Sequence, residues 1–517
     1  MTIQRNPWLI LFVISLIYHF SLLYANINVY DEGIVLTGAE RVKNGDVPYL
    51  DFWTIYPPGQ YYVLGGIFKV FGSSVLVERI YDLLIRCFLS LMPFLISRRL
   101  GCNNWASLTG WMLATVYLGS FTFFSYPVYP ALLLISMGFY SFLKTGPHPI
   151  RSLFVTGIWT GLAALFRHDL AFFAFLCFGL GIVVHYWRKW LVLRRGSFAF
   201  LGGTLLITIP CGLFFLDQVG FRLLFDHLVS TPAEVMPRFR ALPYPSPFHL
   251  ETLQFYIFPA LLFGGVVATL FVIFRFKVRN RSLYGLVILL LTGILVLNQV
   301  RVRSDMIHLL PAVFFSILAL PALFKLVLLP LSRLMVGGRF FYVFACLVVV
   351  LPFLIPLYKK YVQFEFRHFT MTTGWSPIPK SGVSWIPDDV VEVIEYVQEL
   401  TAKGEPIYIG TQNHDQFVIS DVAAYFLADR PPGTRYHELH PGVASTEIVQ
   451  EEIIRDLKYN RVKVVVLAPR FWEEPNESRF DTRTEVLDHY IRTYYEADST
   501  IGIYEVWVKD MGLSLPS

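Results

Sequence analysis

Two adjacent carboxylates, Asp31 and Glu32, are the residues of this sequence best placed to do chemistry. They follow the first long apolar run, where the headgroups of a membrane would lie. Ionisable groups at such a position are costly unless they are paired or hydrated, so they mark a polar site by default. A carboxylate held there could act as a general base that takes the proton from an incoming hydroxyl group. The alternative is structural, because acidic residues suit the cap and first turn of the helix expected over 34–43.

Three arginines are candidates for binding an anionic substrate near these carboxylates. Arg301 and Arg303 come just before an apolar run, and Arg167 lies beside another. A planar guanidinium group can bind a phosphate through two parallel hydrogen bonds, which suits it to a lipid-phosphate ligand. The structural alternative is that these side chains reach the membrane interface and pair with Asp305 and Asp169.

Four further residues are candidates for substrate or metal contacts. Asp305 and His308 would share one face of a helix, since side chains three residues apart are neighbours there. They could bind substrate or contribute two ligands to a divalent metal, or they could form a structural pair. Tyr56 and Tyr61 flank the rigid Pro57-Pro58-Gly59 turn and could stack on a sugar ring. Their alternative is the aromatic belt found at membrane interfaces.

The elements that must position these residues are membrane spans. Of the 517 residues, 55% are hydrophobic and only 16% are charged, whereas soluble proteins are nearer a quarter charged. The charges separate apolar runs of about 17 to 25 residues, the length of a helix that crosses a bilayer. About eleven spans are predicted in this way, near 8–25, 74–97, 105–125, 128–143, 152–167, 170–187, 198–216, 252–274, 284–300, 308–330 and 340–357.

The charge distribution predicts the orientation of these spans. Loops on one side carry basic residues and no acidic ones, namely Arg98-Arg99, 144–151, 188–195, 275–281 and 333–339. This is the positive-inside pattern, which places those loops and the N-terminus in the cytoplasm. Loops on the other side mix acids, bases and histidines, and they contain every candidate above. The chemistry is therefore expected on the outer face of the membrane.

Two further parts of the chain lie on that outer side. The segment 217–251 is rich in proline and aromatic residues and predicts short interfacial helices. It is either a lid over a lipid substrate or an ordered loop. From residue 358 the pattern predicts an α/β domain with no recognisable catalytic set. The expected strands are 406–410, 462–467 and 501–508, and the expected helices are 388–400, 418–427, 447–458 and 485–494.

Several classes of function lack their sequence signals. The chain has no glycine-rich phosphate loop, basic aromatic stripe or zinc-type Cys/His spacing, so no nucleic acid partner is expected. The five cysteines lie in or beside apolar runs at no regular spacing, which argues against a disulfide framework.

The first outer loop resembles that of the GT-C membrane glycosyltransferases. The order Asp31-Glu32-Gly33, an amphipathic segment ending Asn44-Gly45, Pro48-Tyr-x-Asp-Phe-Trp53 and Pro57-Pro-Gly-x-Tyr-Tyr62 carries the resemblance. It is most similar to the bacterial branch related to protein O-mannosyltransferases, aminoarabinose transferases and Rhizobium lipopolysaccharide transferases. The similarity is strong over 8–170 and weaker to 357. Arg-Ser-Asp-x-x-His at 303–308 and the domain after 358 also resemble parts of bacterial members.

This resemblance implies a polytopic GT-C-like fold with an extracytoplasmic α/β domain. It also implies inverting transfer of a sugar from a polyprenyl-phosphate donor to a lipid, glycan or protein hydroxyl. Asp31 matches the acid that serves as base, and Glu32 matches the second acid. Relatives often carry a lysine directly before the Pro-Pro pair, where this chain has Tyr56. Phosphate binding is then expected to fall on Arg167, Arg301 and Arg303.

Two other functions remain open on the sequence alone. A transporter or flippase of lipid-linked sugars would carry ionisable residues near the middle of its spans and would often have repeated halves. The predicted spans show charges at their ends and no matching halves, which disfavours that alternative. A non-catalytic envelope assembly protein would instead depend on the domain 358–517 and not on Asp31.

Overall fold

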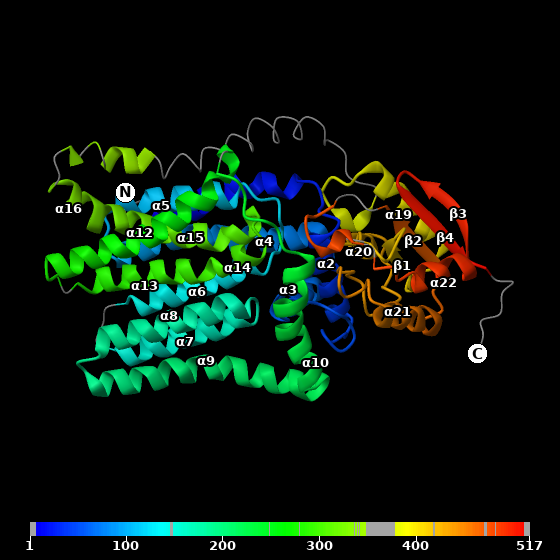
Figure 1. Ribbon diagram of the computed structural model, residues 1–517, viewed down its shortest axis with the longest axis horizontal. Helices are drawn as coiled ribbons and strands as arrows, with labels where there is room; N and C mark the ends of the chain where they lie inside the picture. The colour runs from blue at the N-terminus through cyan, green and yellow to red at the C-terminus, as the bar shows by residue number, and fades with distance from the viewer. Residues whose placement is uncertain are drawn as a thin grey trace.

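The computed structural model has two parts that lie end to end along its long axis (Figure 1). It describes residues 7–144, 148–247, 249–278, 280–334, 337–338, 340, 342–347, 378–416, 419–469, 473–480 and 482–510. A bundle of long helices forms one part, and a smaller domain of helices and strands forms the other. The expected boundary at 357/358 lies outside the described residues.

The bundle is built from helices that are apolar along most of their length. In the described residues, 7 helices are long and apolar enough to cross a membrane. They are α1 with η2 (Pro7–Tyr24), α4 (Val75–Arg99), α8 (His168–Tyr186), α9 (Trp190–Val219), α12 (Gln254–Arg275), α13 (Arg281–Val296) with α14 (Asn298–Val302), and α15 (Met306–Leu323) continued by η5 (Phe324–Leu328) and α16 (Leu329–Ser332). Shorter helices stand among them, namely α5 (Asn104–Leu118), α6 (Val128–Phe142) and α7 (Pro149–Ala164).

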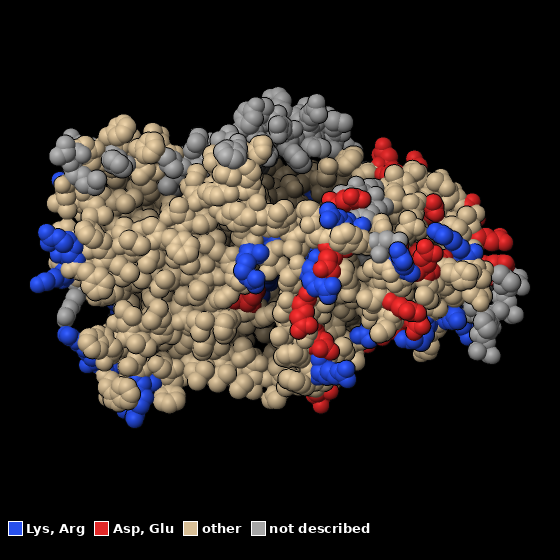
Figure 2. All heavy atoms as spheres, viewed as in Figure 1, with Lys and Arg blue, Asp and Glu red and all other residues tan. Residues whose placement is uncertain are grey.

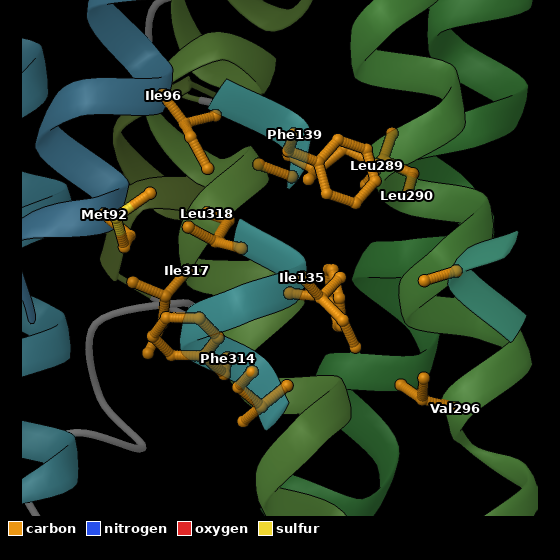
Figure 3. Close-up of a cluster of buried hydrophobic side chains, with 14 of the residues drawn as sticks. Met92, Ile96, Ile135, Phe139, Leu289, Leu290, Val296, Phe314, Ile317 and Leu318 are labelled. Atoms are coloured by element: carbon orange, nitrogen blue, oxygen red, sulfur yellow. The ribbon is translucent and has the colours of Figure 1, made fainter. Parts of the chain in front are cut away.

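These helices confirm the predicted polytopic helical fold. Every predicted span up to residue 330 coincides with one of them. The last predicted span, 340–357, lies mostly outside the described residues. The centre of the bundle is α15, whose residues from Leu309 to Leu323 are all buried, as expected for a helix that is apolar on every side. Figure 3 shows its Phe314, Ile317 and Leu318 packed among side chains of α4, α6 and α13.

Two short helices of the first loop join the bundle to the second part. They are α2 (Asp31–Lys43) and α3 (Gly59–Phe71), which pack against each other. Acidic residues occupy the first turn of α2 and basic residues its last turn, which suits the helix dipole. Gly38 lets the two helices approach, because a Cβ atom there would lie 2.4 Å from the ring of Tyr61. The predicted helix after Asp31 is therefore present and largely buried.

The segment after α9 contains short helices, as predicted. They are α10 (Phe221–Phe225), the π-helix η3 (Asp226–Val235), α11 (Met236–Phe239) and η4 (Leu250–Leu253). Arg238 of α11 pairs with Glu477 of the second part at 2.9 Å. This segment therefore bridges the two parts, while a lid function stays a prediction.

The second part contains the predicted small α/β layer. Its sheet has the order β1-β2-β4-β3, with β1 (Tyr408–Thr411) parallel to β2 (Val464–Ala468) and the hairpin of β3 (Tyr495–Ile501) and β4 (Tyr504–Lys509) completing it. Every residue of β1 and β2 is buried, which indicates that both faces of these strands are covered. The helices are α19 (Asp388–Leu400), α20 (Ala423–Leu427), α21 (Glu447–Tyr459) and α22 (Val486–Tyr494), with 3₁₀ turns η7 (Pro379–Ser381) and η8 (Glu477–Arg479).

The first loop docks directly on this domain through α2 and α20. Thr37 donates a hydrogen bond to the carbonyl of Val422 at 3.0 Å. The backbone N–H of Ala423 donates to the carbonyl of Val29 at 2.8 Å. Gly33 allows this approach, because a Cβ atom there would come within 2.3 Å of the Ala423 nitrogen. The position of Asp31 therefore depends on the C-terminal domain.

Replacing Gly33 with alanine is expected to destabilise the docked domain. The new methyl group would meet backbone atoms, so the two helices must separate, at a cost of about 1–3 kcal/mol. Gly66→Ala on α3 is the matched control, since nothing lies within 4 Å of its Cβ position. There the helix gains about 0.5–1 kcal/mol. Thermal unfolding of both proteins in detergent measures the difference, and equal melting temperatures would contradict the close docking.

Candidate active site

Asp31 begins α2 with an almost unpartnered carboxylate. The residue before it, Tyr30, is the helix cap, so Asp31 is not the N-cap that its type suggested. Asn28 accepts hydrogen bonds from the backbone N–H groups of Tyr30 and Asp31, both at 3.0 Å. The Asp31 carboxylate receives one long bond, from Asn28 Nδ2 at 3.4 Å. In the described residues, its oxygens are therefore largely available to a substrate.

Charges from three separate segments act on this carboxylate. Burial raises the pKa of Asp31, while Arg240, the Asn28 hydrogen bond, His440 and Arg303 oppose that shift. A carboxyl group whose pKa is raised towards neutral pH is a stronger base, and such shifts are common at catalytic positions. The electrostatics therefore favour the predicted role of Asp31 as a base.

Glu32 faces the other way and is fully engaged. Arg79 Nε lies 2.8 Å from Glu32 Oε1, and Arg79 Nη2 lies 3.1 Å from Oε2. The N–H of Asn28 also donates to Oε2 at 2.9 Å. Both partners of the ion pair have fully buried side chains. Because both oxygens of Glu32 are occupied, the geometry favours a positioning role over the predicted catalytic one.

Arg303 and Arg240 are half-buried and both act on the Asp31 carboxylate. Arg303 Nε also donates to Asp305 at 2.8 Å, the pairing that was its structural alternative. Arg303 Nη2 and Nη1 donate to Glu474 of the C-terminal domain at 2.7 and 3.0 Å, and Arg240 Nη1 donates to the same carboxylate at 3.3 Å. Burial and the neighbouring charge of Arg303 lower the pKa of Arg240 despite Glu474 and Asp31. Two guanidinium groups thus share one tightly bound carboxylate, and a further anion would relieve their repulsion.

Arg167 and Tyr56 border the same region. Arg167 donates to both oxygens of Asp169 at 3.0 and 2.8 Å, and to the hydroxyl of Tyr126 at 3.2 Å. Burial is the main cause that raises the pKa of Tyr56. The charges of Tyr126, Asp31 and Glu438 raise this pKa further, while the charge of Arg167 lowers it. Tyr56 therefore lies within electrostatic reach of both Asp31 and Arg167, although Arg167 itself is already paired.

Two other predicted site residues, Arg301 and Tyr61, form hydrogen bonds with neighbouring side chains. Arg301 is exposed, and its Nε donates to Asn298 at 3.1 Å. Tyr61 is buried beneath α2 and shares a 2.7 Å hydrogen bond with the hydroxyl of Thr54. A phosphate contact by Arg301 thus stays a prediction, since the structure shows this side chain exposed on the short helix α14.

Asp305 and His308 contact each other as a structural pair, which was one of the alternatives that the sequence left open. Asp305 caps α15 by accepting from the His308 N–H at 2.9 Å, and it contacts His308 Nδ1 at 2.7 Å. Although burial opposes it, this contact and Arg303 lower the pKa of Asp305 to about 2. Within the described part of the chain, no group of three or more His, Cys, Asp or Glu could hold a metal.

The sequence predicted that ionisable residues lie only at the ends of the spans. This prediction is wrong for α4, which carries four of them within the helix. Glu78, Arg79, Asp82 and Arg86 are all buried in this helix. Arg86 pairs with Asp82 at 2.5 Å and donates to three backbone carbonyls, one at the end of α5 and two in the loop that follows. Their spacing places them on one helical face, a signal that was present in the sequence. Because Arg79 and Arg86 are fully paired, they brace loops around the site.

The charges on the molecular surface are separated along the long axis (Figure 2). The far end of the helical bundle shows lysine and arginine alone on the face drawn, whereas acids and bases are mixed over the C-terminal domain. Asp31 lies at the mixed end, since α2 adjoins that domain. The site is therefore built where the bundle meets the domain.

Comparison with known proteins identifies the fold. No protein-family model and no curated protein matches the chain. A solved structure that does match is the crystal structure of ArnT from Cupriavidus metallidurans bound to undecaprenyl phosphate. The TM-score is 0.57 at 15% identity, over 99% of this chain and 100% of that one. The predicted GT-C-like membrane fold with its C-terminal α/β domain is thereby confirmed.

Proposed function

We propose that this chain, an integral membrane protein with the fold of the aminoarabinose transferase ArnT, is an inverting glycosyltransferase. It would transfer a sugar from a polyprenyl-phosphate donor to a hydroxyl group of a lipid, glycan or protein. The observation that carries the proposal is the half-buried, almost unpartnered Asp31 carboxylate, on which the charges of Arg240 and Arg303 act. Undecaprenyl phosphate in the ArnT structure supports a lipid of this class as the ligand.

The reaction follows from the charges around Asp31. Arg240 and Arg303 would hold the donor phosphate, since guanidinium groups form strong, charge-assisted hydrogen bonds to phosphate oxygens. Asp31 would take the proton of the acceptor hydroxyl while its oxygen attacks the anomeric carbon. The bond from that carbon to the phosphate oxygen breaks, and polyprenyl phosphate leaves with the electron pair. One displacement from the opposite face inverts the anomeric centre.

We further propose that residues 1–357 form the membrane part and residues 358–517 the extracytoplasmic domain. The basic end of the bundle would face the cytoplasm of a bacterium, with the N-terminus on the same side. Asp31 and the C-terminal domain would then lie on the outer face. Lipid-linked sugars would reach Asp31 from the membrane, and acceptors from either the membrane or the aqueous side.

The direct test is a transfer assay with purified full-length protein in lipid nanodiscs. A panel of polyprenyl-phosphate sugars is supplied with membrane glycolipids as acceptors, and mass spectrometry follows both substrates. The expected result is loss of sugar from one donor, release of polyprenyl phosphate and a matching gain in acceptor mass. If no donor is consumed but a lipid-linked sugar crosses the bilayer of proteoliposomes unchanged, the protein is a transporter instead.

Arg240→Ala is expected to weaken donor binding about 10- to 100-fold, the usual loss for hydrogen bonds to a charged group. The effect should fall mainly on KM for the donor, because Arg240 would contact the phosphate both before and during transfer. Arg238→Ala is the matched control, since that side chain is 65% exposed and pairs with Glu477. Equal donor KM values for the two variants would remove Arg240 from the phosphate site.

A further inference from the structure

Three polar side chains of the C-terminal domain are buried without hydrogen-bond partners. They belong to His437, Glu438 and His440, which lie between α20 and α21 and are 0%, 0% and 5% exposed. Among the described residues, neither carboxylate oxygen of Glu438 and no ring nitrogen of the two histidines has a hydrogen bond. His440 Nε2 lies 3.7 Å from Glu438 Oε2. Such burial is costly, which suggests that a ligand supplies the missing partners.

The backbone holds this group against the first loop. The N–H of Trp53 donates to the carbonyl of Arg435 at 3.0 Å. The guanidinium group of Arg435 donates to the carbonyl of Tyr49 at 3.1 Å. Leu439, between the polar residues, is buried in a cluster that also contains Trp53. The segment is therefore fixed in place by contacts that do not use the side chains of His437, Glu438 or His440.

The two histidine rings face aromatic residues of the first loop. The ring of His437 lies 5.2 Å from that of Phe52, and the ring of His440 lies 5.3 Å from that of Trp53. After burial, the charge of Glu438 is the next largest factor raising the pKa of Tyr61. His440 also acts on the Asp31 carboxylate. The group thus borders the proposed reaction centre from the side of the C-terminal domain.

We propose that His437, Glu438 and His440 bind the hydroxyl groups of the transferred sugar. A carboxylate can accept from two neighbouring hydroxyl groups, and an imidazole ring can donate and accept. A lipid tail would leave these polar atoms unsatisfied, and a phosphate would be repelled by Glu438. A polyhydroxylated ring offers several donors and acceptors at once, so it satisfies the group best. The inference rests on the proposed function and adds the C-terminal domain to its substrate site.

Binding of a donor with and without its sugar tests this assignment. Wild type, Glu438→Ala and Glu438→Gln are compared as full-length proteins in nanodiscs. The probes are undecaprenyl phosphate and the undecaprenyl-phosphate sugar that the wild type uses best. Glu438→Ala should weaken binding of the sugar-carrying donor about 10- to 100-fold and leave binding of undecaprenyl phosphate unchanged. Glu438→Gln, which keeps one acceptor oxygen, should show a smaller loss.

Stability separates this role from a structural one. Removing a buried carboxyl group that lacks hydrogen bonds should leave the melting temperature unchanged or raise it, whereas replacing a structural residue would lower it. Glu451→Gln on the exposed face of α21 is the matched control and should change neither property.

The other outcomes overturn the assignment. Equal weakening of both probes would place Glu438 at the phosphate or in the fold. A change confined to the acceptor KM would move the group to the acceptor. Normal binding by Glu438→Ala in a protein that still transfers sugar would contradict the inference alone. A wild type that transfers no sugar at all would contradict the proposed function, and the inference with it.

Discussion

Asp31→Asn is expected to slow sugar transfer by about 10²- to 10⁴-fold, the usual contribution of a general base. Asparagine keeps the size of the side chain and can still accept the hydrogen bond from Asn28. It cannot take a proton from the acceptor hydroxyl, so the chemical step should be lost while donor binding remains. Single-turnover transfer and donor binding, measured on the same preparation, separate these two effects.

The pH dependence of transfer should carry the signature of this carboxylate. Burial raises the pKa of Asp31 above that of an ordinary aspartate. Since the base works only when ionised, the rate should fall as the pH drops through this raised pKa. In Asp31→Asn, the weak residual rate should lack that acidic limb.

Stability should change in the opposite direction to activity. A group with a raised folded pKa binds its proton more tightly in the folded state, so its contribution is lost as the pH rises through that pKa. Asparagine has no charge to bury, and the variant should melt at the same temperature or higher at neutral pH. Asp217→Asn, at an exposed position near the end of α9, is the control. Full activity of Asp31→Asn would exclude the base mechanism.

Most of the fold could be predicted because each signal is local. The length of apolar runs marks the long helices, and apolar stretches between turn residues mark β1, β2 and β4. The strand β3 (Tyr495–Ile501) is not predicted, because its sequence YEADSTI contains two acids and no apolar pattern. The structure explains this composition, since β3 is an edge strand that pairs with β4 alone and is exposed over its middle.

The candidate site was only partly predictable because its residues come from distant segments. Asp31 stands out through its place after an apolar run, but no spacing links it to Arg240, Glu474 or His440. Only the docking of α2 on the C-terminal domain brings those groups together. Arg79 is different, because an arginine within an apolar span is expected to be paired or functional. Its partner could not be chosen from the sequence, since Glu78 and Asp82 are close along α4 whereas Glu32, the actual partner, is 47 residues away.

Arg79→Ala is expected to cost about 3–5 kcal/mol of stability, the usual result of breaking a buried ion pair from one side. Glu32 would be left as a buried charge without its cation. The carbonyl groups of Leu23, Ala25 and Asn26 would also lose the donors that Arg79 now supplies. Arg79→Lys should recover little, because an ammonium group cannot reproduce the bidentate contact. Arg455→Ala, on the exposed face of α21, is the control and should stay within about 0.5 kcal/mol of wild type.

The paired replacement Glu32→Leu with Arg79→Met then decides what Glu32 does. Apolar residues of similar volume often replace a buried ion pair with little loss of stability, so the double variant should melt well above Arg79→Ala. If Glu32 only positions α2, sugar transfer should return together with the fold, because Asp31 keeps its place. If Glu32 takes part in the chemistry, transfer should stay lost in a protein that is again stable. Melting temperature and single-turnover rate, measured side by side, distinguish these results, and the geometry of Arg79 around both oxygens of Glu32 favours the first.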